Sequence, residues 1–150
     1  MDKMIALTKG QKIRLHIIDL GINGEGIAKI DGFAIFVPFA LKDEEILAEI
    51  ISVKKSFANA KLLEIMAPSP VRTKPVCPYC SSCGGCQLMH LQYEKQLEHK
   101  TQSAASSLKK IAKIDHKIED TIGMDEPLRY RNTIRLHIEK KDEAYRVGFY

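Results

Sequence analysis

The chain has 150 residues, of which 45% are hydrophobic and 28% charged, and its formal net charge is +4. This composition is typical of a folded protein with one ordinary domain or two small ones. No apolar run approaches the ~20 residues of a membrane helix, and the N-terminal residues lack the apolar stretch of a signal peptide. We therefore expect a cytoplasmic protein without a membrane partner, of unknown oligomeric state.

Residues 1–66 show the pattern of short strands. Ile13, Leu15 and Ile17 alternate with Arg14 and His16, as in a half-buried strand. The turn dipeptides Asn23-Gly24 and Asp31-Gly32 separate further candidate strands at 27–30, 33–37, 46–53 and 60–65. Five short strands with glycine turns predict a small OB-like β-barrel, a fold that often binds oligonucleotides. The alternative interpretation is a different small β-barrel that binds other proteins, because the fold alone does not decide the function.

Basic residues gather near the end of this region. Residues 1–66 carry nine basic and nine acidic groups, so the net charge comes from the rest of the chain. Between Val53 and Lys74, a single carboxylate, Glu64, faces five basic residues: Lys54, Lys55, Lys61, Arg72 and Lys74. Such a stripe is a candidate phosphate track, and a merely solvated face explains the charge equally well. Phe57, beside two of the lysines, is either a base-stacking residue or a barrel residue.

All four cysteines lie within ten residues, at Cys77, Cys80, Cys83 and Cys86. Three prolines between 67 and 76 predict a stiff linker before them. Soft thiolates select iron–sulfur clusters, zinc or cuprous copper. Zinc sites usually have two ligand pairs separated by a longer stretch, whereas closely spaced cysteines with one distant ligand are typical of iron–sulfur clusters. The spacing therefore favours an iron–sulfur cluster over zinc, and the lack of a secretory signal disfavours disulfides. His90 could offer a metal nitrogen, although a surface or capping role is more common.

A helix and a hairpin are predicted after the cysteines. Apolar residues at helical spacing indicate an amphipathic packing helix over about 91–111; they are Tyr93, Leu97, Ala104, Leu108 and Ile111. Alternation predicts a strand at 133–136, a turn at 140–143 and a second strand at 145–150.

A polar and aromatic group precedes that hairpin. Tyr130, Arg131, Asn132 and Arg135 combine stacking, charge and amide groups, a mix that can bind an unstacked base or a phosphate. Ordinary edge-strand polarity is the alternative.

Three segments resemble one family. The run from Ser69 to Tyr79, then Cys83-Gly84-Gly85-Cys86-Gln87-Leu88 and Tyr93-Glu94-Lys95-Gln96-Leu97, closely resembles the iron–sulfur segment of RNA uracil-5-methyltransferases that make 5-methyluridine in 23S ribosomal RNA. The segments 24–29 and 36–38 resemble the TRAM domain of that family, and 130–132 with 147–150 resemble the strands after its cluster.

The resemblance implies which residues bind a cluster and which functions lie in another domain. Cys77, Cys83 and Cys86 would ligate a structural 4Fe-4S cluster, Cys80 would occupy a non-ligand position, and the fourth ligand would follow Tyr150. The family also uses S-adenosylmethionine and a nucleophilic cysteine, both in a C-terminal domain that is absent from these 150 residues. The family enzyme attacks uracil C6 with that cysteine, methylates C5 and removes the C5 proton.

We therefore expect an N-terminal fragment that is inactive alone and binds RNA, with ribosomal RNA favoured over transfer RNA. Its parts would be a TRAM-like barrel at 1–66, a linker and iron–sulfur loop at 67–90, and the start of a central RNA-binding domain at 91–150. The alternative is a complete RNA-binding adapter in which Cys80 is the fourth ligand of an iron–sulfur or zinc site.

Overall fold

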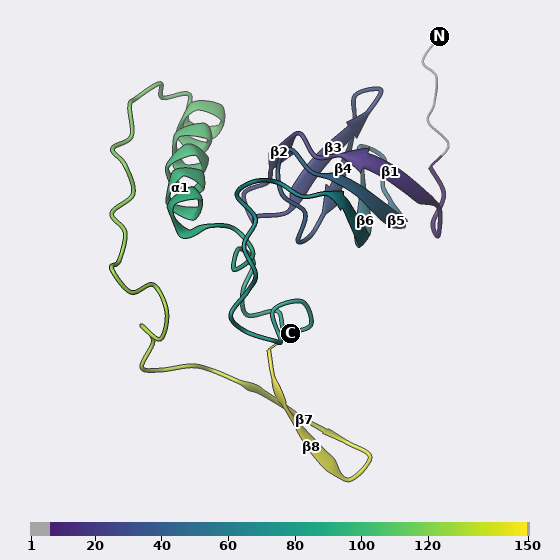
Figure 1. Ribbon diagram of the computed structural model, residues 1–150, viewed down its shortest axis with the longest axis vertical. Coiled ribbons are helices and arrows are strands. Elements are labelled where there is room, and N and C mark those ends of the chain that lie inside the picture. The colour runs from purple at the N-terminus through teal and green to yellow at the C-terminus, as the bar shows by residue number, and fades with distance from the viewer. Residues whose placement is uncertain (1–6, 150) are drawn as a thin grey trace. The chain divides into compact units, whose positions relative to one another are not determined.

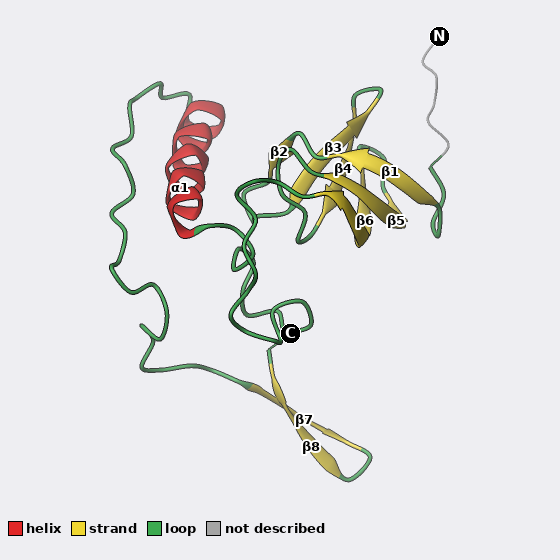
Figure 2. Ribbon diagram, in the orientation of Figure 1, coloured by secondary structure: helices red, strands yellow, loops and turns green. Residues whose placement is uncertain are grey.

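The computed structural model describes residues 7–149, and the chain divides into two compact units between Arg72 and Thr73. The first unit contains strands β1 (Lys12–His16), β2 (Asp19–Leu20), β3 (Gly26–Ile30), β4 (Phe33–Val37), β5 (Glu45–Val53) and β6 (Phe57–Ala67) (Figure 1). The second contains helix α1 (Tyr93–Ser107), the π-helical turn η1 (Leu108–Ala112), and strands β7 (His137–Lys141) and β8 (Ala144–Gly148) (Figure 2).

The strands of the first unit form one sheet in the order β1-β5-β6-β4-β3-β2. Neighbouring strands are antiparallel except β4 and β6, which are parallel. Only Ile17 and Ile18 separate β1, at one edge, from β2, at the other, and the Ile18 N–H donates to the Ile27 carbonyl at 2.8 Å. Because one continuous stretch of chain serves both edges, the sheet curls on itself. The predicted small OB-like barrel is thus confirmed.

Alternate residues of these strands fill the barrel. Ile35 and Val37 of β4 and Ile46 and Ile50 of β5 are fully buried, as expected for period-2 strands with one face on a core. Gly26 lies where the packing is tightest, since a Cβ there would come within 2.9 Å of the Ala40 carbonyl oxygen. The predicted turn dipeptides are also confirmed, with positive φ at Gly24 (83°) and Gly32 (85°).

Helix α1 starts two residues later than predicted, and no residue of it is fully buried. Its partner is the segment 121–124, where the Met124 N–H donates to the Tyr93 hydroxyl at 2.9 Å and the Thr121 N–H donates to the Thr101 hydroxyl at 2.9 Å. The predicted inward position of Ile111 is wrong, because this side chain is 80% exposed on η1.

The hairpin also starts later than predicted. Residues 133–136 are not part of a strand, so that prediction is wrong. The pairing starts at His137, which is in register with Gly148 at the end of β8. The turn falls at Asp142 and Glu143, both at positive φ, inside the predicted range. Tyr150, the end of the predicted second strand, lies outside the described residues.

Within residues 7–149, no helix has the length and apolar character needed to cross a membrane.

Candidate functional site

Three of the predicted RNA-binding lysines lie on one hairpin of the barrel. Lys54 and Lys55 form the turn between β5 and β6, where the Lys54 N–H donates to the Phe57 carbonyl at 2.8 Å. Lys61 lies further along β6, in register with Glu49 of β5. All three lysines are exposed. The fold therefore places three ammonium groups beside the strand that carries Phe57.

Phe57 points away from the barrel core. Its neighbours in sequence on β6 alternate, with Ala58 buried and Asn59 half-buried on the side of Phe57. The Phe57 ring meets the Phe36 ring edge to face, with centroids 5.5 Å apart and planes at 80°. Asn59 donates from Nδ2 to the Ser52 hydroxyl at 3.0 Å. The sequence reasoning missed Phe36, although its place between inward Ile35 and Val37 signals an outward side chain.

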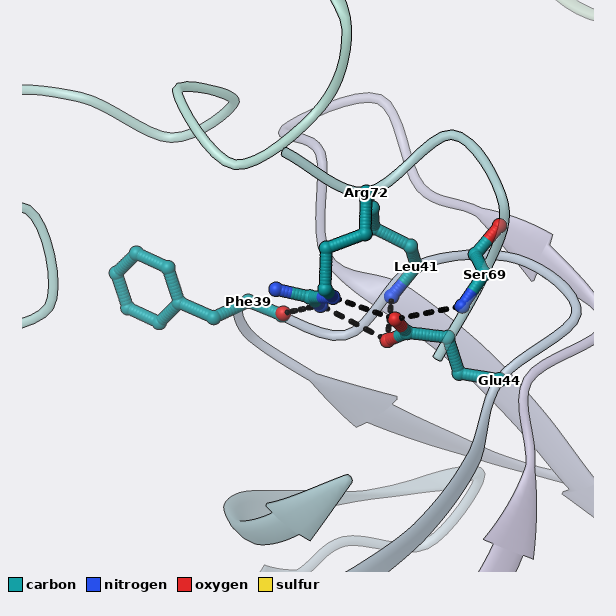
Figure 3. A network of polar contacts seen from close by, with 5 residues as sticks. All are labelled: Phe39, Leu41, Glu44, Ser69 and Arg72. Carbon is teal, nitrogen blue, oxygen red and sulfur yellow. Dashed lines mark hydrogen bonds and ion pairs between the residues drawn. The ribbon is translucent and has the colours of Figure 1, made fainter. Parts of the chain in front are cut away.

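Arg72, another predicted RNA-binding residue, is held by the barrel instead of standing free. Figure 3 shows its guanidinium against the Glu44 carboxylate, which is fully buried. Arg72 donates from Nε to Glu44 Oε1 at 2.5 Å and from Nη2 to Glu44 Oε2 at 2.8 Å. Nη2 also donates to the Phe39 carbonyl at 2.6 Å.

The same carboxylate accepts two backbone bonds, from the N–H of Leu41 at 2.8 Å and from that of Ser69 at 3.2 Å (Figure 3). Burial alone would raise the pKa of the Glu44 carboxyl, but the hydrogen bonds from Arg72 and the two N–H groups outweigh it and hold this pKa below its ordinary value. Glu44 thus fastens the chain after β6 to the barrel up to Arg72, inside the segment predicted to be a linker.

The remaining predicted RNA-binding residues belong to the second unit. Lys74 is exposed. Tyr130, Arg131, Asn132 and Arg135 are exposed as well and lie outside helices and strands. The Arg131 guanidinium lies 5.6 Å from the centre of the Tyr130 ring, and its Nε donates to the Tyr130 hydroxyl at 3.2 Å. These contacts join two neighbours in sequence, and an RNA role for the group stays a prediction.

The cysteine loop is built from successive tight turns. The N–H of Cys80 donates to the Cys77 carbonyl at 3.3 Å, and the N–H of Cys83 donates to the Tyr79 carbonyl at 2.8 Å. All four cysteines are free thiols; Cys80 is buried, Cys77 and Cys83 are half-buried, and Cys86 is exposed. Burial raises the pKa of the Cys80 thiol, and the nearby thiols of Cys86, Cys77 and Cys83 raise it further.

The four free thiols of the loop are soft ligands, and soft ligands suit a soft metal centre such as zinc or an iron–sulfur cluster. No group of three or more cysteine, histidine or carboxylate residues within 7–149 is arranged to hold a metal ion. A cluster on Cys77, Cys83 and Cys86, with or without Cys80, stays a prediction.

Two neighbours define the surroundings of this loop. His90 is only 2% exposed, so a surface position for it is wrong, and its carbonyl accepts from the Thr73 N–H at 2.9 Å. Phe149 lies beside the loop, since a Cβ built on Gly85 would come 3.3 Å from the Phe149 ring and 3.4 Å from the Cys83 sulfur. The end of the hairpin is thus adjacent to the cysteines.

Comparison with known protein families gives a match in the first unit of the chain. Residues 6–63 match the TRAM domain family, and this match agrees with the six-stranded barrel of the first unit.

The whole chain is similar in sequence to about a third of the length of proteins that are RNA methyltransferases by name. An uncharacterised RNA methyltransferase of Clostridium acetobutylicum is 44% identical to this chain. The alignment covers 100% of this chain and 33% of the length of that protein. One of Staphylococcus aureus is 46% identical, over 98% of this chain and 33% of its own. The structure of a Pyrococcus abyssi tRNA (uracil-54, C5)-methyltransferase with S-adenosyl-L-homocysteine is 34% identical over 67% of this chain and 21% of that chain, with a TM-score of 0.47.

The resemblance to RNA methyltransferases seen in the sequence is therefore confirmed. The chain spans about a third of the length of the curated relatives that it matches.

Proposed function

We propose that this chain is the RNA-binding, iron–sulfur-bearing part of an S-adenosylmethionine-dependent RNA (uracil-5-)-methyltransferase, with 23S ribosomal RNA as the favoured substrate. The observation that carries the proposal is the union, in one chain similar to RNA methyltransferases, of a TRAM barrel with a lysine-rich hairpin and a loop of four free cysteines. S-adenosylmethionine would supply the methyl group in the whole protein, and no residue of this chain is assigned to that transfer.

In this proposal Cys77, Cys83 and Cys86 hold a 4Fe-4S cluster, which supplies iron–sulfur bonds that tie the loop together when bound. The contact of Phe149 with Gly85, next to Cys83, supports a fourth ligand contributed from beyond Tyr150. The backbone turns at Cys80 and Cys83 keep the thiols close together along one short stretch of chain.

Anaerobic purification tests the cluster. We expect iron and acid-labile sulfide in equal amounts, and visible absorbance that bleaches on reduction. Cys83→Ser should lose the iron, whereas Cys80→Ser, the matched control on the same loop, should keep it. Stoichiometric zinc without sulfide would contradict the cluster.

RNA binding is tested by its dependence on salt. Each phosphate contact releases counterions, so the logarithm of affinity should fall linearly with the logarithm of salt concentration. Replacing both Lys54 and Lys55 by Ala should weaken binding and lower that slope by about 1 to 2. The double variant Lys110→Ala with Lys117→Ala, which removes two exposed lysines of the second unit, is the control and should leave the slope nearly unchanged. Comparing ribosomal with transfer RNA fragments then tests the substrate class, and tighter binding of transfer RNA would reject the ribosomal assignment.

A second candidate is an RNA-binding adapter without catalysis, in which Cys80 is the fourth ligand. The observation that favours it is the burial of Cys80, which has the least exposed side chain of the four free cysteines on this short loop. Loss of metal in Cys80→Ser as complete as in Cys83→Ser would select this ligand set.

A further inference from the structure

The outer face of the barrel carries two aromatic rings that its core does not use. The apolar side chains packed against the core from partly buried positions are Ile13, Ile30, Phe33, Leu62 and Ile65. Phe36 and Phe57 are not among them, and both remain half-buried on the outside of the sheet. The protein therefore keeps two large rings on its surface that contribute little to the barrel interior.

Strand register brings these rings together with polar groups. Phe36 of β4 is in register with Ile27 of β3 on one side and with Asn59 of β6 on the other. In the next row, Phe57 is in register with Ala34, whose own partner on β3 is Lys29. Small Ala34 leaves room beside the Phe57 ring, and the two rings meet at 80°. In such an edge-to-face pair, at most one face of one ring is covered by the other ring, and both residues keep part of their surface exposed.

The charge around the rings is positive. Lys29 lies at the end of the Phe57 row, Lys54 and Lys55 form the turn that enters β6 at Phe57, and Lys61 lies four residues along the same face. The carboxylate in register with this group, Glu49, lies opposite Lys61. An aromatic surface with a rim of lysines is complementary to a ligand that has flat apolar rings and a negative backbone.

We propose that Phe36 and Phe57 form a stacking platform for an unpaired base of single-stranded RNA, with the surrounding lysines holding the adjacent phosphates. This inference rests on the proposed RNA-binding function and names the part of the barrel that performs it. The ligand is single-stranded because a base must leave its own stack before an aromatic side chain can take the place of its neighbour.

Asn59 gives the platform an edge that can form hydrogen bonds with a base. Its side chain lies on the same face as Phe57, two residues away, and one of its two amide N–H groups donates to Ser52. That bond fixes the orientation of the amide, and the second N–H and the carbonyl oxygen remain as one donor and one acceptor. A donor and an acceptor side by side match the Watson–Crick edge of uracil or cytosine.

The test uses the full chain and a short oligouridine that carries 5-iodouridine. Irradiation should crosslink the base to Phe36 or Phe57, as read by mass spectrometry of the wild-type protein. Phe57→Leu and Phe36→Leu, which keep apolar volume but remove the ring, should each weaken binding about 5- to 100-fold with the salt slope unchanged. Phe57→Tyr should restore binding, and Leu63→Ala, an exposed apolar residue of the same strand, is the control and should bind like the wild type.

The outcomes separate this inference from the function on which it rests. If the wild type binds neither oligouridine nor structured RNA, the proposed function fails and the platform with it. If the wild type binds RNA but crosslinks elsewhere, and both leucine variants bind as tightly, the platform is rejected while RNA binding stands. Should a leucine variant unfold, as judged by circular dichroism, the crosslink on the wild-type protein decides.

Discussion

Replacing Arg72 by Met should destabilise the barrel, because it leaves the Glu44 carboxylate buried without its counter-charge. Glu44 is 0% exposed, and Arg72 supplies two of the four hydrogen bonds described for that carboxylate. Breaking a buried ion pair by removing one partner costs about 3–5 kcal/mol. The Arg72 side chain is 19% exposed and the N–H bonds of Leu41 and Ser69 remain, so we expect a smaller cost, about 2–4 kcal/mol.

The assay is native-state hydrogen exchange of the full chain, read at the amides of β4 and β5. It reports the free energy of unfolding of the first unit separately from the second. Arg14→Met is the matched control, since Arg14 is exposed on β1, and it should change the free energy by less than about 0.5 kcal/mol. A cost for Arg72→Met as small as that of Arg14→Met would refute the reasoning.

Removing both partners sharpens the test. The double variant Glu44→Leu with Arg72→Met takes away the buried charge as well as its partner, and such replacements are often close to neutral. We therefore expect the double variant to be more stable than Arg72→Met alone. Strict additivity of the two single changes would show that Glu44 and Arg72 do not act as a pair.

Three further predictions follow from other contacts. Acidification should lower the stability of the barrel, because the pKa of Glu44 is below its ordinary value of 4.5 in the folded state. Between the folded-state and unfolded-state pKa values, the unfolded chain binds more protons than the folded chain. The stability that the Glu44 carboxylate contributes is therefore complete above pH 4.5 and is lost as the pH falls through the folded-state pKa. Urea unfolding from about pH 6 to about pH 3 should show a steeper loss for the wild type than for Glu44→Gln, and parallel curves would contradict this. Gly26→Ala should cost about 1–3 kcal/mol in thermal unfolding, because its Cβ would lie 2.9 Å from the Ala40 oxygen, whereas Gly148→Ala, with nothing within 4 Å, should be near neutral. Thr101→Val should speed amide exchange at Thr121 by about 5- to 10-fold through loss of one hydrogen bond, while Thr101→Ser keeps the hydroxyl and should exchange like the wild type.

Local patterns were sufficient to predict most of the barrel. Alternation along β4 and the dipeptide Asp31-Gly32 each depend on residues next to one another, so the sequence alone reveals them. The short strand β2 was not predicted, because two residues are too few to show an alternation of polar and apolar side chains. Strand β6 starts at Phe57, before the predicted start at Ala60, because pairing with β5 extends the strand to the turn. Such pairing depends on a partner strand and has no signature within β6 itself.

The candidate site was less predictable because its decisive contacts join residues far apart in the chain. Arg72 reads as a free cation in the sequence, yet its partner Glu44 lies 28 residues earlier. Phe36 and Phe57 meet only because β4 and β6 run side by side in parallel, with β5 between them in the chain. The cysteines, by contrast, are neighbours in sequence, and their spacing was informative without any tertiary contact.

The Glu44–Arg72 pair also changes how the basic stripe should be counted. A cation releases counterions on binding RNA only if it is free to meet a phosphate. Arg72 is already bound by Glu44 and the Phe39 carbonyl, and Lys74 belongs to the second unit. The barrel therefore offers Lys54, Lys55 and Lys61 from the five basic residues of the stripe, and Lys29 in addition, which the sequence did not single out. If the proposed RNA binding holds, charge patterning along the chain overestimates one end of the predicted basic stripe and misses Lys29 at the other, because pairing and strand register decide which charges are free to meet a phosphate.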